Sequence, residues 1–285
     1  MDTVDEIEDA VAAEQCPASA VCVQEDAYLL ELSLDWIVLR ASENIHHLLG
    51  ESHVTLIDEP LGKFVHSQAL HDLRNLFSKL SGTTGIGRAY AVRLTDDPDL
   101  VDIAFQQVDG RVLLEAVPSV GCFGECFGSV GGLIAGLANS KGQALLDGGA
   151  RRMRALTGYD RVILDCGDRR AESSRGAFSG SVDPTDLPIM VANAGAPAVH
   201  LFPRDDQDSV AQAALLRSPD DAAGRELKGA AVRAALRIPF GADGLSCEFR
   251  CESRSARTPS FELHAAAELF AQMFAMRLAI DEASG

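Results

Sequence analysis

Hydrophobic and polar residues alternate in short runs along the first third of the chain, a pattern typical of β-strands. The runs cover 27–32, 36–42, 88–94, 101–107 and 112–117. Asp109-Gly110 separates the last two runs, and this dipeptide favours a tight hairpin. A short helix is expected over 43–49 with Ser42 as its cap, and apolar residues at 73, 76, 77 and 80 predict a second helix. This part therefore predicts an antiparallel sheet with short helices.

The rest of the chain repeats this mixture with longer helices. A glycine- and cysteine-containing segment at 119–129 is interpreted as a linker, and 130–156 as one long helical segment. Strands are expected at 161–165, 198–202, 231–240 and 245–251, and a last helix at 261–283. The chain is thus divided into an acidic N-terminal arm (1–20), a first domain (21–118), the linker (119–129) and a second domain (130–283). Both domains are predicted to be α+β, each an antiparallel sheet with flanking helices.

The last helix carries apolar residues on two sides. One stripe contains Leu263, Ala267, Phe270, Phe274 and Leu278, and the other contains Leu269, Met273, Met276 and Ile280. A helix that is apolar on two sides needs two partners. One partner is its own sheet, and we expect the other to be a second copy of the chain, with the helical segment at 130–156 beside it. The alternative is that the first domain or the arm covers the second stripe.

Composition excludes several classes of function. The 285 residues contain 25 Lys plus Arg and 42 Asp plus Glu, a net charge of −17. Such a chain does not bind nucleic acid or an anionic membrane through its overall charge. The apolar stretch at 130–138 is far shorter than the roughly 20 residues of a membrane helix, and the acidic N-terminus is unlike a signal peptide. We therefore expect a cytoplasmic protein.

The seven cysteines are an odd, scattered set that does not resemble a secreted disulfide framework. Two C-x3-C pairs, Cys122/Cys126 and Cys247/Cys251, raise the possibility of zinc. The second pair falls in an expected strand, where positions four apart are separated by about 13 Å, too far for one metal without a bend. No G-x-S-x-G motif occurs, and the glycines at 131–136 do not match a phosphate loop. We expect no metal and no enzymatic activity.

Four motifs, met in order along the chain, resemble those of bacteriophytochromes. Leu156-Thr157-Gly158-Tyr159-Asp160-Arg161-Val162 is similar to the L-T-G-Y-D-R-V sequence that opens their GAF domain. The segment 227–236 resembles their L-K-N-M-G-V-R-A-S-M strand, and 27–50 resembles the beginning of their PAS domain. The segment 108–115 resembles their H-D-G-L-L-I-L-E hairpin. The resemblance extends over about residues 16–280.

The resemblance implies a PAS domain followed by a GAF domain, with the N-terminal segment threaded through a GAF lasso in a phytochrome-type knot. It also implies biliverdin or a related bilin in the GAF domain. By position, Cys16 corresponds to the cysteine that tethers the bilin, with Cys22 as a rival. Asp186 corresponds to the aspartate at the pyrrole nitrogens, Arg217 to a propionate-binding arginine and Ser218 to the serine beside it. The alternatives are that Asp186 only stabilises its turn and that Arg217 is a surface residue.

This sequence also departs from the family pattern. Asp221 or Ala222 stands where the family has a histidine, and Cys251-Glu252-Ser253 replaces its C-H-H motif. These departures leave two hypotheses. The first is a photoreceptor that binds a bilin, forms a homodimer and signals through a separate partner such as a histidine kinase or regulator. The second is a pigment-free PAS–GAF module for dimerisation and protein interaction that regulates a signalling protein.

Overall fold

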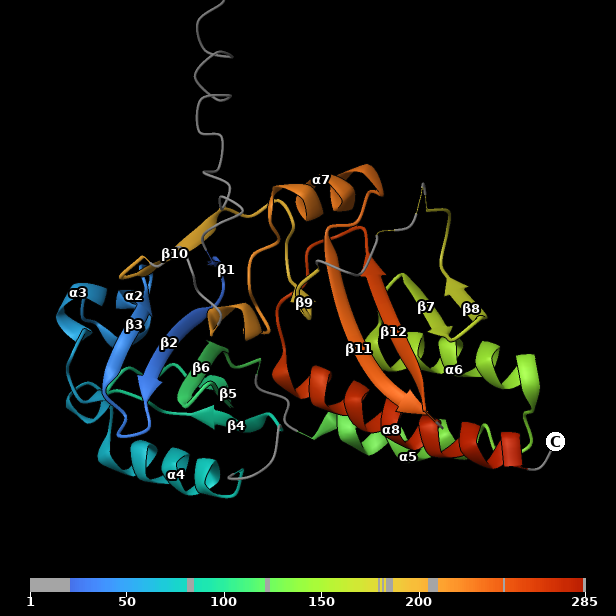
Figure 1. Cartoon of the computed structure of the whole chain (residues 1–285), viewed down its shortest axis with the longest axis horizontal. Helices are drawn as coiled ribbons and strands as arrows, with labels where there is room; N and C mark the ends of the chain where they lie inside the picture. Colours follow the sequence, from blue (N-terminus) through green and yellow to red (C-terminus); the bar gives the residue numbers. More distant parts are fainter. Residues whose placement is uncertain are drawn as a thin grey trace, which may run out of the picture.

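The structure is a computed structural model of the chain, and it describes residues 21–80, 85–120, 124–178, 180, 182, 187–204, 210–242 and 244–283. It contains two antiparallel sheets with helices, as the sequence predicts (Figure 1). Cys16 and Asp186 lie outside the described residues. No helix among the described residues is long and apolar enough to cross a membrane.

The first sheet is seven-stranded, and most of its strands come from the first domain. Its order is β1-β10-β3-β2-β6-β5-β4. The strands are β1 (Cys22–Gln24), β2 (Tyr28–Ser33), β3 (Val38–Ser42), β4 (Gly87–Val92), β5 (Val101–Val108), β6 (Arg111–Pro118) and β10 (Ala198–Phe202). The helices here are α2 (His46–Leu49), α3 (His53–Leu56), η1 (Leu61–Lys63) and α4 (Ser67–Ser78). Because β10 comes from the second domain, the two domains share a sheet.

Two local predictions in this domain had different outcomes. The hairpin is confirmed, since Asp109 and Gly110 have φ angles of 47° and 75° and Val108 pairs with Arg111. The expected cap is wrong. Helix α2 begins at His46, and the Ser42 hydroxyl accepts a hydrogen bond from the Leu29 amide of β2 at 3.1 Å. A contact across the sheet therefore replaces a local cap.

The second sheet is five-stranded, with the order β8-β7-β12-β11-β9. Its strands are β7 (Arg161–Cys166), β8 (Arg169–Ser174), β9 (Met190–Val191), β11 (Ala234–Ala242) and β12 (Leu245–Ser253). β8 was not predicted, because its sequence, RRAESS, is almost entirely polar. It forms the exposed edge of the sheet, where pairing with β7 on one side is enough to hold it.

Three helices lie on one side of this sheet, two against its strands and one packed on those two, and we call this side the inner face (Figure 1). They are α5 (Glu125–Ala135), α6 (Gly142–Thr157) and α8 (Phe261–Ala283). The expected segment at 130–156 is thus two helices, and α5 begins inside the expected linker. The carboxylate of Glu262 accepts hydrogen bonds from the amides of Gly124 and Cys126 at 2.8 and 3.4 Å. These bonds give partners to backbone N–H groups at the start of α5 that have none within the helix.

The last helix has the predicted bounds and buries the first predicted stripe. Phe270 and Phe274 are fully buried and stack at 6.1 Å between ring centroids. Both meet Phe249 of β12 edge-on. The second stripe lies differently, because Met276 is 67% and Ile280 60% exposed. The homodimer on this stripe remains a prediction.

The two domains also meet through buried polar side chains. Arg88 of β4 contacts His264 and Glu268 of α8, at 2.8 Å from the His264 Nδ1 and 2.7 Å from a Glu268 oxygen. Burial, together with the nearby positive charge of Arg88, lowers the pKa of His264 to about 3. The imidazole is therefore neutral near pH 7, and it serves as a fixed polar contact between β4 and α8.

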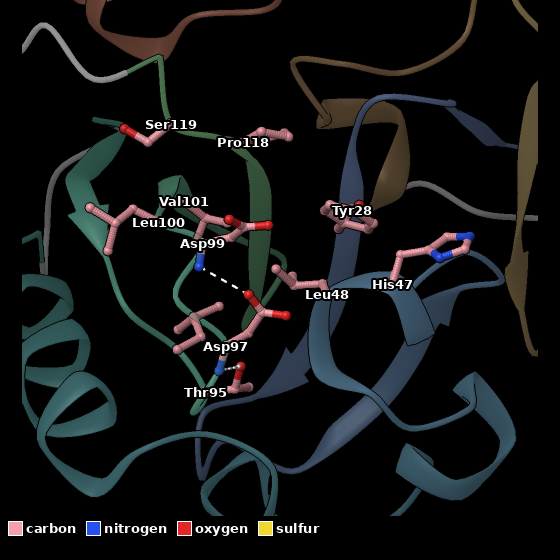
Figure 2. A pocket seen from close by; sticks show the side chains of 11 residues that line it. Tyr28, His47, Leu48, Thr95, Asp97, Asp99, Leu100, Val101, Pro118 and Ser119 are labelled. Atoms are coloured by element: carbon pink, nitrogen blue, oxygen red, sulfur yellow. Dashed lines mark hydrogen bonds between the residues drawn. The ribbon is translucent and has the colours of Figure 1, made fainter.

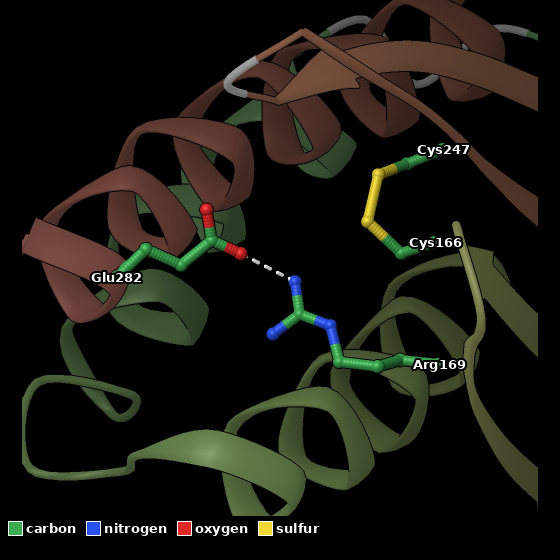
Figure 3. The surroundings of a disulfide bond; sticks show 4 residues. All are labelled: Cys166, Arg169, Cys247 and Glu282. Atoms are coloured by element: carbon green, nitrogen blue, oxygen red, sulfur yellow. Dashed lines mark hydrogen bonds and ion pairs between the residues drawn. A yellow bond between two sulfur atoms is a disulfide. The ribbon is translucent and has the colours of Figure 1, made fainter. Parts of the chain in front are cut away.

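A disulfide joins two neighbouring strands of the second sheet. Cys166 of β7 lies directly opposite Cys247 of β12, with a Cα–Cα distance of 4.2 Å (Figure 3). Nearby, Arg169 of β8 forms an ion pair with Glu282 near the end of α8. Cys22 is also disulfide-bonded. The spacing of the cysteines along the sequence did not indicate the Cys166–Cys247 pair, because the strand register brings these two distant residues together.

Candidate functional site

The first candidate site is the place where β1 is held by the second domain. On one side β1 pairs with β10, with Cys22 opposite His200. On the other side Val23 forms a bridge with Arg217, and the Ser218 amide donates to the Cys22 carbonyl at 2.8 Å. β1 therefore runs between two segments of the second domain. The knot that the resemblance implies remains a prediction, because it also involves residues outside the described ones. Arg217 and Ser218, two of the predicted ligand-binding residues, contribute their backbone to the contact with β1.

A buried glutamine locks β1 further. The Gln24 side-chain amide donates to the Met190 carbonyl at 2.7 Å and to the Arg217 carbonyl at 3.1 Å. Its side-chain oxygen accepts from the Ala192 amide at 2.7 Å. Gln24 is only 3% exposed, so each of these bonds satisfies a group that water cannot reach. The side chain links β1 to β9, to the residue that follows β9 and to Arg217.

A carboxyl group of the first domain holds the same junction from the other side. Both oxygens of Glu115 on β6 accept hydrogen bonds, from the amides of Leu215 and Leu216, each at 2.8 Å. Burial raises the pKa of Glu115 to about 7, although the two amide hydrogen bonds oppose the shift. This carboxyl group titrates in the physiological range, at the contact between the PAS sheet and the segment that encloses β1.

The second candidate site is the other face of the five-stranded sheet, which we call the outer face. Its strands carry charged residues that form cross-strand ion pairs. Arg161 donates to Glu252 at 2.7 Å, Arg250 to Asp165 at 2.6 Å and Arg237 to Glu248 at 2.8 Å. Arg161, Glu252 and Arg250 are each at most 5% exposed. Buried charges are tolerated only when they are paired in this way.

The same three arginines also donate hydrogen bonds to the segment that covers the outer face, of which Gly180, Val182 and Leu187 are the contacted residues. Arg161 donates to the Gly180 carbonyl at 2.7 Å, Arg250 to the Val182 carbonyl at 2.6 Å and Arg237 to the Leu187 carbonyl at 2.7 Å. The guanidinium of Arg161 also lies over the Phe178 ring, 4.1 Å from its centroid. Each arginine thus links a carboxylate on a neighbouring strand to the backbone of the covering segment.

Sequence reasoning missed these residues as a group. Arg161 was noticed only as part of the Leu156–Val162 motif. The available signal was the alternation of charged and apolar residues along 247–252, which marks a strand with one polar face. It could not show that this polar face is buried, because that depends on contacts with Gly180, Val182 and Leu187, which lie far from these strands in the sequence.

A short helix, α7 (Asp221–Gly229), borders the outer face and was also not predicted. Asp220 caps it by accepting from the amides of Ala222 and Ala223 at 3.0 and 2.8 Å. Leu227 of α7 packs with Val191 and Ala235 of the sheet. The helix therefore fixes the position of the charged side chains on its exposed side.

The first domain contains a separate open pocket of about 290 Å³, shown in Figure 2. Tyr28, His47 and Asp97 line it together with Leu48 and Val101. The side-chain hydrogen bonds marked in Figure 2 are turn contacts within 95–99, where the Asp99 amide donates to Asp97 at 3.0 Å and the Asp97 amide donates to Thr95 at 3.3 Å. These bonds stabilise a turn and do not create a set of groups aimed at a ligand.

Comparison with solved structures identifies the fold. The chromophore-binding domain of an unusual bacteriophytochrome from R. palustris superposes with a TM-score of 0.72 over 93% of this chain and 96% of that one, at 20% identity. The chromophore-binding domain of a Stigmatella aurantiaca phytochrome superposes with a TM-score of 0.71 over 92% of this chain and 97% of that one, at 22% identity. This chain has the fold of a bacteriophytochrome chromophore-binding domain. The resemblance and the PAS–GAF architecture that it predicts are confirmed.

The chain matches only part of a longer phytochrome module, and the match is one of structure and not of sequence family. The photosensory core module of the Stigmatella aurantiaca phytochrome superposes with a TM-score of 0.75 at 21% identity, and the present chain covers 95% of its own length but 60% of that module. No protein-family model and no curated protein matches the sequence. The similarity is therefore one of fold, and function has to be argued from the residues of the site.

The residues of the outer face can be tested against a bilin. A bilin requires donors for two propionates, a polar group at its pyrrole nitrogens and space for a flat ring system. The arginines at 161, 237 and 250 already donate to carboxylates and to the carbonyls of the covering segment. His200 lies at the Cys22 junction and His264 at the contact with β4. The described residues of the outer face do not fit a bilin.

Proposed function

We propose that this chain is a sensory signalling module in which fixed ion pairs occupy the position of a pigment. The observation that carries the proposal is the triple link on the outer face, where Arg161, Arg237 and Arg250 each join a carboxylate to a carbonyl of the covering segment. A ligand there would have to break charged hydrogen bonds, of which the Arg161–Glu252 pair is buried from water. The module works by changing its contacts and not by catalysis.

The proposed route for a signal runs through the junctions between the domains to α8. The first domain is tied to the second by the pairing of β1 with β10, by Glu115 and by the contact of Arg88 with His264 and Glu268. Because these contacts are buried and directional, a structural change in the first domain shifts the position of α8. We propose that α8 passes it to a second copy of the chain and to a separate partner, such as a histidine kinase or regulator, in the cytoplasm.

The dimer is proposed from the exposed stripe of α8. Leu269, Met276 and Ile280 are 38%, 67% and 60% exposed, and burial of the exposed part of each would contribute about 0.5–2 kcal/mol. A twofold pair of helices buries the same stripe in both subunits. Light scattering after size exclusion should give twice the 30.3 kDa chain mass, and Met276→Glu should reduce it to one chain. Val54→Glu, at an exposed valine of α3, is the control, and a wild-type mass of one chain would contradict the dimer.

The absence of a pigment is tested by co-expression with a biliverdin source. We expect the purified chain to show no red or far-red absorbance band, before or after denaturation. A band would overturn the pigment-free proposal in favour of the second candidate, a bilin photoreceptor, which the extent of the matching fold favours. If the colour remained on the denatured chain, Cys16→Ser should abolish it, whereas retained colour would rule out Cys16 as the tether.

A further inference from the structure

A groove beside the outer face collects basic side chains, in a chain whose net charge is −17. Its volume is about 660 Å³, within the range of small-molecule sites. Arg225 and Lys228 of α7 line it, together with Arg233 and Arg254. The other residues described around it are small or apolar: Ala194, Gly195, Gly224, Ala231 and Val232. Of these basic side chains, Arg254 is paired with the carboxylate of Asp160.

Two of the arginines are held in position by polar groups of the protein. The Arg233 guanidinium donates to the Asn193 side-chain oxygen through Nε and Nη2, at 3.3 and 3.1 Å. It lies so close to Gly195 that a Cβ there would come within 3.1 Å of Nη2. Arg254 donates to the Arg175 carbonyl at 2.8 Å and lies 3.7 Å from Asp160. Each guanidinium has five N–H groups, so these contacts position it and leave further donors for a ligand.

The other two basic residues come from a single helix. Arg225 and Lys228 are three positions apart on α7, so they project from the same side. Gly224 lies beside them, and a Cβ at this position would have no atom within 4 Å. The helix therefore presents two cations next to open space, in the same groove as the two anchored arginines.

We infer that this groove binds a compact polyanion, a small molecule that carries a diphosphate group. Four cations around one groove require several negative charges within a short distance. A diphosphate supplies them on adjacent phosphorus atoms, whereas successive carboxylates of an extended peptide are about 3.3 Å apart along the chain at the closest and alternate in direction. Guanidinium groups match phosphate oxygens in pairs. Large polyanions are disfavoured, because the chain's overall charge repels them.

Calorimetric titration of the full chain with inorganic pyrophosphate, at about 150 mM salt, tests this inference. We expect a dissociation constant below about 1 mM and at least tenfold weaker binding of citrate, a carboxylate of similar charge. A parallel titration with ADP shows which part of the ligand is recognised. Tighter binding of ADP than of pyrophosphate indicates a nucleotide, and equal binding of the two indicates that only the diphosphate is recognised. Absence of pyrophosphate binding, or equal binding of citrate, would overturn the inference.

Two double variants distinguish binding at this groove from attraction by the overall charge of the chain. Arg225→Gln with Lys228→Gln should weaken pyrophosphate binding at least tenfold, whereas Lys79→Gln with Arg93→Gln in the first domain changes the net charge equally and should leave it unchanged. Gly224→Glu places a carboxylate in the groove at a helical position with open space, so it should abolish binding without loss of folding. Equal effects of the two double variants would overturn the site. A pigment found in the GAF domain would overturn the proposed function without affecting these results.

Discussion

The two faces of the five-stranded sheet are built from the same strands and are stabilised in different ways. On β12, Phe249 and Cys251 point to the inner face and pack among the helices. Their neighbours Arg250 and Glu252 point to the outer face and form ion pairs. The stability of the inner face depends on how well its side chains fill the available volume, because close-packed apolar side chains exclude water. The stability of the outer face depends on the pairing of opposite charges, because each buried arginine requires a hydrogen-bond acceptor.

This difference bears on how the fold can change function. A packed apolar face tolerates few alterations, since any change of volume leaves a cavity or a clash. A face of ion pairs can be rearranged by exchanging donors and acceptors while the strands stay in place. The outer face is thus the part of this sheet that can differ from those of chromophore-binding relatives, while the inner face maintains the shared fold.

The largest effect is expected on the inner face. Phe249 is fully buried and contacts the rings of Phe240, Phe270 and Phe274. Phe249→Ala removes most of the side chain and leaves a cavity, so the free energy of unfolding should fall by about 4 kcal/mol. Chemical denaturation followed by circular dichroism measures the change. Phe249→Leu, which keeps most of the volume, should cost less than half as much, and an equal loss in both variants would contradict a role for volume.

The next effect concerns the pairing of charges on the outer face. Arg161→Met alone or Glu252→Leu alone leaves a buried charge without its partner, so each should lower the free energy of unfolding by about 3 kcal/mol. The double variant removes both charges and should be within about 1 kcal/mol of the wild type. The same denaturation experiment provides the full cycle. If the double variant lost the sum of the two single losses, the pair would not be coupled.

A smaller effect, which depends on pH, is expected at the junction around Glu115. The pKa of this carboxyl group is about 7 in the folded chain and about 4.5 when unfolded, so the folded chain holds an extra proton between these values. Its contribution to stability is therefore present below pH 4.5 and is lost as the pH rises to 7, by roughly 2–3 kcal/mol. Glu115→Gln imitates the protonated form and should lack this pH dependence.

The difference in unfolding free energy between wild type and Glu115→Gln, measured from about pH 5 to 8, isolates this group. The pKa of His264 is lowered to about 3, so its contribution has the opposite sign and is lost as the pH falls below 6.5. His264 is present in both proteins, and its contribution cancels. Parallel stability curves for the two proteins would show that Glu115 does not titrate in this range.

Several elements were predictable because their signals are local. The β5–β6 hairpin is encoded by Asp109-Gly110, and the bounds of α8 by its helical period. The four motifs at 27–50, 108–115, 156–162 and 227–236 together predicted the PAS–GAF order, which the solved structures confirm. β8 and α7 were missed because their sequences are polar, and the contacts that stabilise them come from distant parts of the chain.

By itself the sequence determined which stretches could be strand or helix, the order of the two domains and the sign of the overall charge, since each depends on composition or on neighbours a few positions away. Only the tertiary structure decided which polar residues are buried together. Arg161 and Glu252 are 91 positions apart, and Gln24 and Met190 are 166 apart. Strand pairing brings such residues within hydrogen-bond distance, and no short-range pattern encodes that register. The chemistry of the outer face and of the β1 junction therefore arises only in the folded chain.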